Sequence, residues 1–480
     1  APAYVPMLPV VILDAEHGDG SALLLASLEL TARYHIVSLA AAPAAAAAHG
    51  ALAVVGGACG DDGMDELAFL VLRLLVDVGH AANSCDLFAF LADVPRYAGC
   101  RALLRTCRKE LHTLSVRDLT VVSGPAPLPA LPIDGRIDAG KVYEKQLRRL
   151  PAAALAAPLT PRVGACSAPV HVALVTGGLR GVGLRVGKML LDEQRASRVV
   201  LVGRSAPRAS DACLIEALVA RGAEVRLCDV GDWAMVETLP DAELVVHCAG
   251  AIDDQLMQHV TAGRCAAVLR PKVRGINLLR RRYGKRARVV AFSSSSSLFG
   301  VAGQATYAAA NAYLDELLGG EAVQWGGWGE VGMAVDFSIE PTKGERFVAL
   351  STGLQLLGKI MDGPPRSRPA AAIDADWKQY STNLSIFGAD EAPLYSSLVA
   401  QEDGGLLAES TPLVGLHMAC GVAHTFTLTL GGTSGPWQLL RQHVVGRTAV
   451  VPASAYLAWV VAALQELRHG DMETLRFEDC

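Results

Sequence analysis

The stretch "VHVALVTGGLRGVGLRVGKMLLDE", residues 170–193, predicts a strand, a glycine-rich turn and an amphipathic helix. Its opening run is continuously apolar, which is typical of a strand covered on both faces by helices. Glycines in the turn let the backbone approach a pyrophosphate, and the start of the following helix faces that negative charge. The stretch therefore predicts a dinucleotide-binding turn. The expected contacts are Thr176, Gly177, Gly178, Gly181 and Gly183.

The same alternation continues through "RVVLVGRS", "LIEALVARGAEVRLCDV", "ELVVHCAG" and "ARVVAFSSS", and it predicts a parallel, doubly wound sheet. Arg204 ends the second strand where an acidic residue would bind a free ribose 2′-hydroxyl, so it favours a 2′-phosphate and NADPH over NADH. The alternative is a solvent-exposed arginine at a strand end. His247 is expected to be packed rather than catalytic. The other expected groove residues are Ser205, Asp229, Val230, Ala249 and Gly250.

The first 150 residues repeat this rhythm weakly, with "PVVIL" and "DLTVV" as candidate strands. The turn after the first of them carries Asp14, Glu16 and Asp19, which would repel a phosphate. We therefore expect a cofactor-free structural pseudo-repeat. The proline-rich stretches at 123–135 and 151–169 are expected to be connectors.

Composition limits the function. The 480 residues are too many for one core, and a net charge of −5 argues against a general nucleic-acid or anionic-membrane binder. No stretch has the pattern of a transmembrane helix or a signal peptide, and the Ala-Pro-Ala start predicts a fragment. The 11 cysteines contain no Cys-x-x-Cys pair, so we expect reduced thiols and no metal site.

A second segment, "AFSSSSSLFGVAGQATYAAANAYLDE" at 291–316, places a lone tyrosine among alanines. Asn311 lies one helical turn after Tyr307, and Ser294 lies thirteen residues before it at the end of a strand. Such a helix could be a packing face, but the three side chains together predict a site. The other serines, Ser293 and Ser295 to Ser297, are interpreted as turn and helix-entry residues.

Several ordered motifs support this site: Gly177–Gly183, "PKVRGINLL", the serine run, "GQATYAAANAYLDE" and "VQWGGWGEVGMA". In this order they resemble the ketoreductase domains of type I polyketide synthases and animal-type fatty acid synthases, within the short-chain dehydrogenase/reductase superfamily. The resemblance runs from about Pro9 to Tyr380. Arg180 departs from it, because many polyketide reductases have glycine there.

The resemblance implies the residue roles. Tyr307 would donate a proton to the β-carbonyl oxygen and Ser294 would hydrogen-bond that oxygen. Lys272 would lower the tyrosine pKa and hold the nicotinamide ribose, and Asn311 would support the proton relay. The hydride would come from NADPH.

Stereochemistry is predicted from "AGAIDDQLM", where Ile252-Asp253-Asp254 resembles the Leu-Asp-Asp motif of reductases that form a D-configured hydroxyl. The alternative class carries tryptophan eight residues before the tyrosine, where this chain has Phe299. The two aspartates could instead merely cap a loop or helix. The expected substrate and stereocontrol residues are Asp254, Phe299, Trp325 and Met333.

The carboxyl-terminal piece contains "TPLVGLHMACGVAHTFTLTL", which alternates like strands, and "VVPASAYLAWVVAALQEL", which predicts a helix. Around His443 and Pro452 it resembles the first hot-dog half of a polyketide synthase dehydratase. Gln442, the shifted Gly446 and Thr411 depart from that family. His443 would belong to an incomplete site, because the family's acid is carried by a second half that is missing here.

The predicted fold is α/β, with tandem doubly wound Rossmann-type parallel sheets and a partial hot-dog fragment. Its expected parts are a structural subdomain (1–165), a catalytic NADPH-binding subdomain (166–385), a linker (386–409) and a partial dehydratase (410–480). The predicted function is reduction of a β-ketoacyl thioester tethered to an acyl carrier protein by phosphopantetheine. The parent would be a dimeric cytoplasmic or plastid synthase. The alternatives are a catalytically silent scaffold and a free-standing alcohol dehydrogenase.

Overall fold

The computed structural model divides the chain into two compact units, Ala1–Leu394 and Tyr395–Cys480. The structure describes residues 8–12, 34–49, 51–56, 64–92, 94–121, 134–138, 141–145, 147, 169–363, 366, 368–385, 394–395, 398–399, 406–409, 416–420, 423–427, 444–445 and 448–449. Several predictions fall outside these residues: those on Asp14, Glu16, Asp19, Thr411, Gln442, His443, Gly446 and Pro452.

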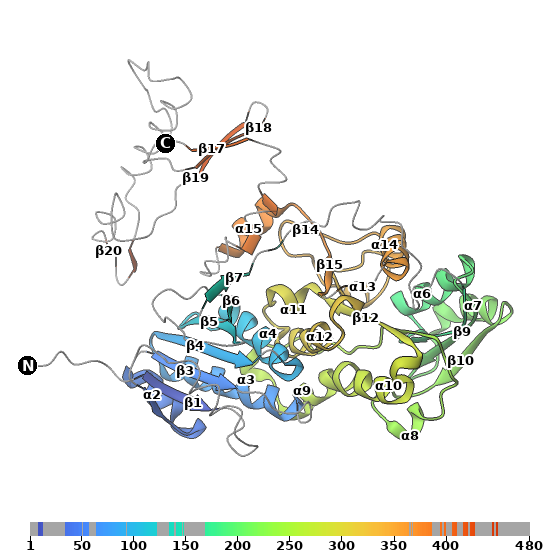
Figure 1. Ribbon diagram of the computed structural model, residues 1–480, viewed down its shortest axis with the longest axis horizontal. Coiled ribbons are helices and arrows are strands. Elements are labelled where there is room, and N and C mark those ends of the chain that lie inside the picture. The colour runs from blue at the N-terminus through green and yellow to red at the C-terminus, as the bar shows by residue number, and fades with distance from the viewer. Residues whose placement is uncertain are drawn as a thin grey trace, which may run out of the picture. The chain divides into compact units, whose positions relative to one another are not determined.

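The sheet that follows the second connector, called here the carboxyl-terminal sheet of this unit, contains seven parallel strands in the order β10-β9-β8-β11-β12-β13-β15 (Figure 1). Its strands are β8 (Val170–Thr176), β9 (Ala196–Gly203), β10 (Ala223–Leu227), β11 (Leu244–His247), β12 (Arg288–Ser294), β13 (Ala322–Trp325) and β15 (Ala370–Ala372). Apolar side chains of the central strands are buried on both faces. The predicted doubly wound sheet is confirmed, and its order reverses between β8 and β11, where such sheets form a crevice at the carboxyl ends of the strands.

Helices cover both faces of this sheet. They are α6 (Gly181–Asp192), α7 (Ala209–Val219), α8 (Trp233–Val236), α9 (Ala262–Leu269), α10 (Gly275–Tyr283), α11 (Ser295–Phe299), α12 (Ala305–Leu318), α13 (Met333–Asp336), α14 (Leu350–Asp362) and α15 (Trp377–Ser385). Short helical turns complete the set: η3 (Met257–His259), η4 (Arg270–Arg274), η5 (Gly284–Arg286) and η6 (Gly319–Glu321). Strands β14 (Glu345–Arg346) and β16 (Asp374–Ala375) form a small antiparallel pair, and β16 ends just before α15 begins.

A second seven-stranded sheet occupies the amino-terminal part of the same unit, in the order β2-β1-β3-β4-β5-β6-β7. Its strands are β1 (Leu8–Ile12), β2 (Tyr34–Ile36), β3 (Ala51–Gly56), β4 (Cys85–Ala92), β5 (Leu114–Val121), β6 (Asp134–Asp138) and β7 (Lys141–Glu144), with η1 (Leu39–Ala41), α2 (Ala42–His49), α3 (Met64–Ala81) and α4 (Pro95–Glu110) between them. The order of its parallel strands matches that of the carboxyl-terminal sheet without the edge strand β10, and β7 alone pairs antiparallel. The predicted tandem of Rossmann-type sheets is therefore confirmed.

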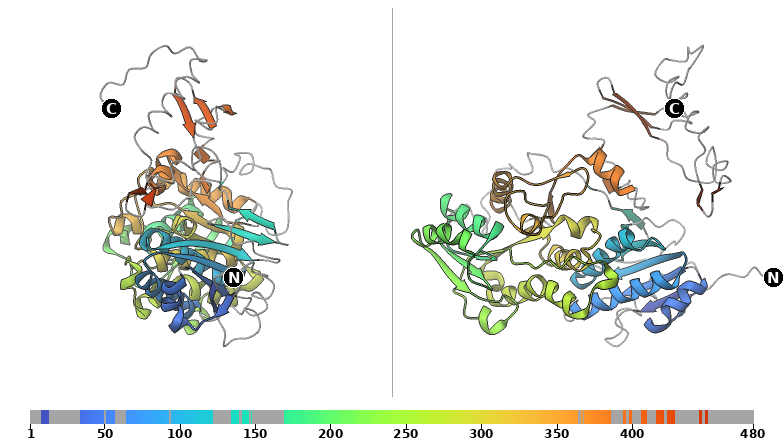
Figure 2. Two further views of the ribbon diagram at one scale, coloured as in Figure 1. Left: turned by 90° about the vertical axis from the view of Figure 1, so that its left-hand side faces the viewer. Right: turned by 180° about the vertical axis from the view of Figure 1, so that it is seen from behind.

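The two halves of this unit meet through α4 and α12, which lie side by side in all views (Figures 1 and 2). Ala98 and Ala102 of α4 pack against Ala308 and Ala312 of α12. A Cβ atom on Gly99 would lie only 3.2 Å from the carbonyl oxygen of Ala309. The alanines after Tyr307 thus serve close helix packing, which holds the tyrosine helix against the amino-terminal half.

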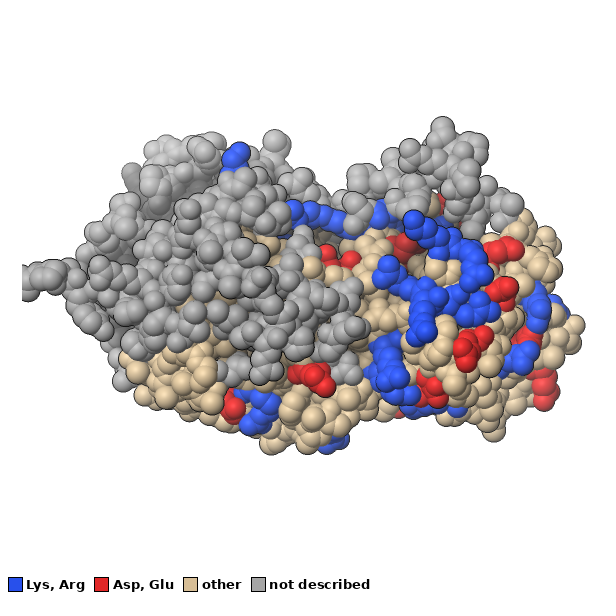
Figure 3. Space-filling model, turned by 60° about the horizontal axis from the view of Figure 1, so that its bottom comes forward, with Lys and Arg blue, Asp and Glu red and all other residues tan. Residues whose placement is uncertain are grey.

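Positive side chains gather on one face of the molecule (Figure 3). The last turn of α10 carries Arg280, Arg281 and Arg282, and η5 adds Lys285 and Arg286. Because β12 begins at Arg288, this basic run lies at the amino-terminal edge of the sheet. The crevice at the carboxyl ends of the strands is on the opposite edge.

The second unit contains two small antiparallel sheets among its described residues. Strands β17 (Leu406–Glu409), β18 (Leu416–Cys420) and β19 (Ala423–Thr427) form one, and β20 (Val444–Val445) and β21 (Thr448–Ala449) form the other. Strands β18 and β19 lie within residues 411–430, where the alternating pattern predicts strands. The predicted helix at 450–467 lies outside the described residues. Nothing in the described part of the chain is a helix both long and apolar enough to cross a bilayer.

Candidate active site

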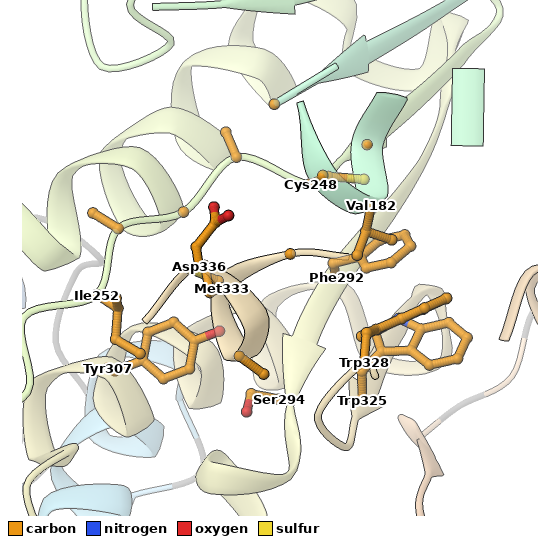
Figure 4. Close-up of a pocket in the computed structure, with 18 of the residues that line it drawn as sticks. Val182, Cys248, Ile252, Phe292, Ser294, Tyr307, Trp325, Trp328, Met333 and Asp336 are labelled. Carbon is orange, nitrogen blue, oxygen red and sulfur yellow. The ribbon is translucent and has the colours of Figure 1, made fainter. Parts of the chain in front are cut away.

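A pocket of about 510 Å³ opens at the carboxyl ends of the strands of the carboxyl-terminal sheet (Figure 4). Predicted site residues from the glycine turn, the ends of β9 and β11, and the serine–tyrosine segment all line it. These are Gly177, Gly181, Gly183, Arg204, Ser205, Asp229, Val230, Ala249, Gly250, Lys272, Ser294, Tyr307, Trp325 and Met333. Thr176, Gly178, Asp254, Phe299 and Asn311 are not among the lining residues.

The glycine turn is built for close backbone approach. Gly177 has a φ of +68°, and a Cβ atom on it would lie 2.9 Å from the amide nitrogen of Ala249. A Cβ atom on Gly183 would lie 2.4 Å from the carbonyl oxygen of Gly177. The first turn of α6 carries no acidic residue and begins in the pocket wall. This cradle fits a phosphate group bound at a helix N-terminus.

Thr176, the last residue of β8, links the glycine turn to the end of β11. It is fully buried, and its Oγ1 lies 2.8 Å from Nδ1 of His247 and accepts a hydrogen bond from the amide of Ala249. Burial, together with the charge of Lys272, lowers the pKa of His247 to about 3, so the imidazole is neutral. The geometry agrees with a packed His247.

The part of the pocket wall that follows β9 and β10 carries an exposed arginine, Arg204, and a hydrogen-bonded aspartate, Asp229. Arg204 follows β9, and among the described residues no side chain forms an ion pair with its guanidinium. Asp229 is fixed, because its Oδ1 accepts from the amide of Gly231 at 2.9 Å and its Oδ2 accepts from Arg270 at 3.2 Å. An unpaired guanidinium here can take a ligand's phosphate.

Lys272 reaches the pocket from η4, a π-helical turn between α9 and α10. Such turns occur frequently at functional sites, and Pro271 within it has no backbone N–H to donate. The side chain is 2 % exposed, and its Nζ donates to the carbonyl oxygen of Phe292 at 2.7 Å. Burial lowers the pKa of Lys272 to about 8, so the ammonium form predominates at pH 7.

Tyr307 lies in the first turn of α12, and its hydroxyl points toward Ser294 in the pocket (Figure 4). Nζ of Lys272 lies 5.9 Å from the centre of its ring. Burial raises the pKa of Tyr307 to about 12, and hydrogen bonding with Asn311 and Ser294 opposes the rise. The phenol is therefore protonated and can act as a proton donor.

Asn311 is fully buried one turn later, and its Nδ2 donates to the carbonyl oxygen of Tyr307 at 2.8 Å. Its Oδ1 has no hydrogen-bond partner among the described residues. A buried acceptor without a partner lowers the stability of the fold. The side-chain oxygen of Asn311 is therefore free to accept a hydrogen bond.

Ser294 ends β12 and is the N-cap of α11. Its Oγ accepts hydrogen bonds from the amide of Ser296 at 3.2 Å and from the Ser296 hydroxyl at 3.0 Å. A hydroxyl has one hydrogen and two lone pairs, so the hydrogen of Ser294 remains available for the pocket. Ser293 instead bonds the carbonyl oxygen of Asn311, and Ser297 bonds Asp315.

The predicted stereocontrol residues occupy different places. Trp325 and Met333 line the pocket, and Trp325 stacks on Phe292 with ring centres 5.3 Å apart. Asp254 lies outside the lining, but its Oδ2 accepts from Nε2 of Gln304 at 3.0 Å. Phe299 is buried away from the pocket, against Trp377 and Tyr380 of α15.

Sequence reasoning missed three contributors. Gln304 lines the pocket three residues before the tyrosine, and Arg270 precedes Lys272 by two, so proximity to recognised motifs was an available signal. The third is a bidentate ion pair between Arg208 and Asp336 at 2.7 and 2.9 Å, which joins the start of α7 to α13. These two residues are 128 positions apart, and no local pattern links them.

Residues 172–337 match the family model described as KR domain. This part of the chain is therefore similar to KR domains. The chain is 36% identical over 256 residues to polyketide synthase GfsA of Streptomyces halstedii, an alignment that covers 48% of this chain and 3% of that protein. The chain thus spans a small part of this relative's length.

Two solved structures share the fold of this region and of the amino-terminal repeat. One is described as "Structure of A1-type ketoreductase" (TM-score 0.66) and the other as "Structure of A-type Ketoreductases from Modular Polyketide Synthase" (TM-score 0.65). Each is 24% identical, and each alignment covers 83% of this chain and 94% of the other. At this identity the likeness concerns the fold alone.

Proposed function

We propose that the chain reduces a β-ketoacyl thioester with NADPH, forming a D-configured β-hydroxyacyl thioester within a multidomain polyketide or fatty acid synthase. The observation that carries the proposal is one pocket with two chemically distinct parts. Tyr307, Ser294 and Lys272 converge in one part. The glycine turn and Arg204 follow β8 and β9, which are two and three strands away from β12 in the sheet.

The side chains divide the work at the ketone oxygen. A bound nicotinamide cofactor would supply the hydride. Ser294 donates its remaining hydrogen to the carbonyl oxygen, and Tyr307 transfers its phenolic proton to that oxygen. The ammonium of Lys272 favours the negative charge that Tyr307 acquires when its proton leaves. Asn311 holds the first turn of α12 through the carbonyl oxygen of Tyr307.

NADPH is proposed because Arg204 is exposed beside the pocket without an ion-pair partner among the described residues. A 2′-phosphate would supply the anion that a guanidinium binds best. Similarity to a polyketide synthase supports a substrate tethered to an acyl carrier protein. The dehydratase role of His443 remains a prediction from sequence.

The proposal is tested by NADPH oxidation with a β-ketoacyl thioester, compared with a simple ketone. Faster turnover of the thioester supports a synthase ketoreductase, whereas preference for the simple ketone supports a free-standing alcohol dehydrogenase. No turnover of either by folded protein that binds NADPH would support a silent scaffold.

Product configuration is tested separately by chiral chromatography of the reduced thioester. The proposed D-product is supported by Asp253 and Asp254 in the loop beside the pocket. A predominantly L-product would remove Asp254 as a guide to configuration, while leaving the reductase assignment in place.

A further inference from the structure

The last residue of α4, Glu110, binds two loops of the catalytic half. Its Oε2 accepts from the amide of Met257 at 2.6 Å, and its Oε1 accepts from the amide of Gly303 at 2.8 Å. These partners are 147 and 193 residues away in sequence. A carboxylate at a helix C-terminus is disfavoured by the helix dipole. The hydrogen bonds from these two amides offset that unfavourable interaction, which explains why an acidic residue is tolerated at this position.

The two loops are also bonded to each other at the pocket rim. The amide of Gln255 donates to the carbonyl oxygen of Gly303 at 2.8 Å, and Gln304 donates to Asp254. Gln304 lines the pocket and stands three residues before Tyr307. Any movement of Gly303 is therefore transmitted to the pocket wall beside the proton donor.

The same part of α4 contacts the second loop at other points. Gly300 has a φ of +65°, and a Cβ atom there would lie 2.6 Å from the backbone of Arg105 and Thr106. Arg105 donates from Nη1 to the carbonyl oxygen of Ser297 at 2.9 Å. The carboxyl-terminal half of α4 thus packs against, and hydrogen-bonds to, the segment that runs from Ser294 to Tyr307.

We propose that Glu110 is a positioning residue for stereocontrol: it fixes the 253–257 and 300–304 loops and so sets which face of the ketone the pocket presents. The inference rests on the proposed reductase function. It assigns the amino-terminal repeat a role in selectivity, through one carboxylate that holds both loops. Glu110 does not line the pocket, so it acts through Asp254 and Gln304.

The test is Glu110→Gln, which keeps the size of the side chain but replaces one acceptor oxygen by an NH₂ donor. One of the two loop amides then faces a donor and loses its bond. Hydrogen exchange at Met257 and Gly303 should quicken roughly tenfold or more, as expected for loss of a charge-assisted bond. The minor enantiomer should increase and KM for the tethered thioester should rise, while the Kd for NADPH changes less than about twofold.

Glu216→Gln, on the exposed surface of α7, is the matched control and should change none of these quantities. Unchanged exchange at both amides, or faster exchange with an unchanged product ratio, would overturn the proposal. Glu110→Asp, which keeps the charge and shortens the side chain, provides a second variant if Glu110→Gln does not fold. Failure of the wild-type protein to reduce any ketoacyl thioester would count against the proposed function, and the exchange rates would still decide whether Glu110 holds the loops.

Discussion

Replacing Lys272 by methionine should stabilise the cofactor-free protein at pH 7 while removing most of its reduction. Lys272 is buried and forms no ion pair with a carboxylate among the described residues, and its Nζ donates a hydrogen bond to the carbonyl oxygen of Phe292. Its pKa falls from 10.5 to about 8. At ~1.4 kcal/mol per pH unit, keeping the ammonium in the fold costs about 3 kcal/mol.

The lost hydrogen bond offsets part of the gain, by about 0.5–1.5 kcal/mol. Methionine fills the same volume with a flexible apolar chain. A net stabilisation of about 2 kcal/mol corresponds to a rise in Tm of roughly 2–3 °C for a unit that spans residues 1–394. The loss of activity follows from removal of the charge beside Tyr307.

The sign of the pH dependence follows from linkage. The folded-state pKa of Lys272 lies below its ordinary value, so the unfolded chain binds more protons between about pH 8 and 10.5. Wild-type stability therefore rises with pH across this window, and the advantage of Lys272→Met should shrink. Thermal melts at pH 7 and pH 10 measure this difference, with Lys285→Met as an exposed control. A variant that is no more stable than wild type at pH 7, with a difference independent of pH, would refute the reasoning.

Three further predictions concern activity. Tyr307→Phe should lower kcat by roughly 10²–10⁴-fold with little change in the Kd for NADPH, because only the proton donor is lost; wild-type turnover would contradict the assignment. Arg204→Ala should weaken NADPH by roughly ten- to a hundredfold, and NADH far less, in titrations of the purified protein; equal losses would show a structural arginine. The profile of kcat/KM should fall as pH rises through about 8, where Lys272 loses its charge; a level profile from pH 7 to 9.5 would contradict this.

The sequence predicts this fold well where apolar runs and glycine turns recur locally. The strands after Val170 follow from patterns that each lie within a few residues, whereas Lys272, which lines the same pocket as Ser294 and Tyr307, is expected only from the family resemblance. The orientation of Phe299 does not follow from such patterns, because a motif position gives no information on which neighbour covers the ring.

Long-range contacts of single side chains are equally invisible in one sequence. Glu110 has an ordinary place at the end of a helix, and only the folded chain brings the amides of Met257 and Gly303 to it. The same holds for Arg105, which reaches the carbonyl oxygen of Ser297. Side chain–backbone bonds of this kind impose no residue type on the partner, so they leave no spacing or pairing to recognise.

Several buried polar groups of the described residues lack hydrogen-bond partners, and some of them belong to the predicted site or support it. Oδ1 of Asn311, Nε1 of Trp325 and Nε2 of His247 are all buried without a hydrogen bond among the described residues. Each such group costs about 1–3 kcal/mol, and the ammonium of Lys272 adds its own desolvation. Apolar packing offsets these costs, including the alanine contact between α4 and α12. Because Trp325 and Lys272 line the pocket, a bound ligand can supply hydrogen-bond acceptors for the indole N–H and the ammonium group. The buried indole of Trp325 and the ammonium of Lys272 are therefore groups that a ligand in the pocket can satisfy.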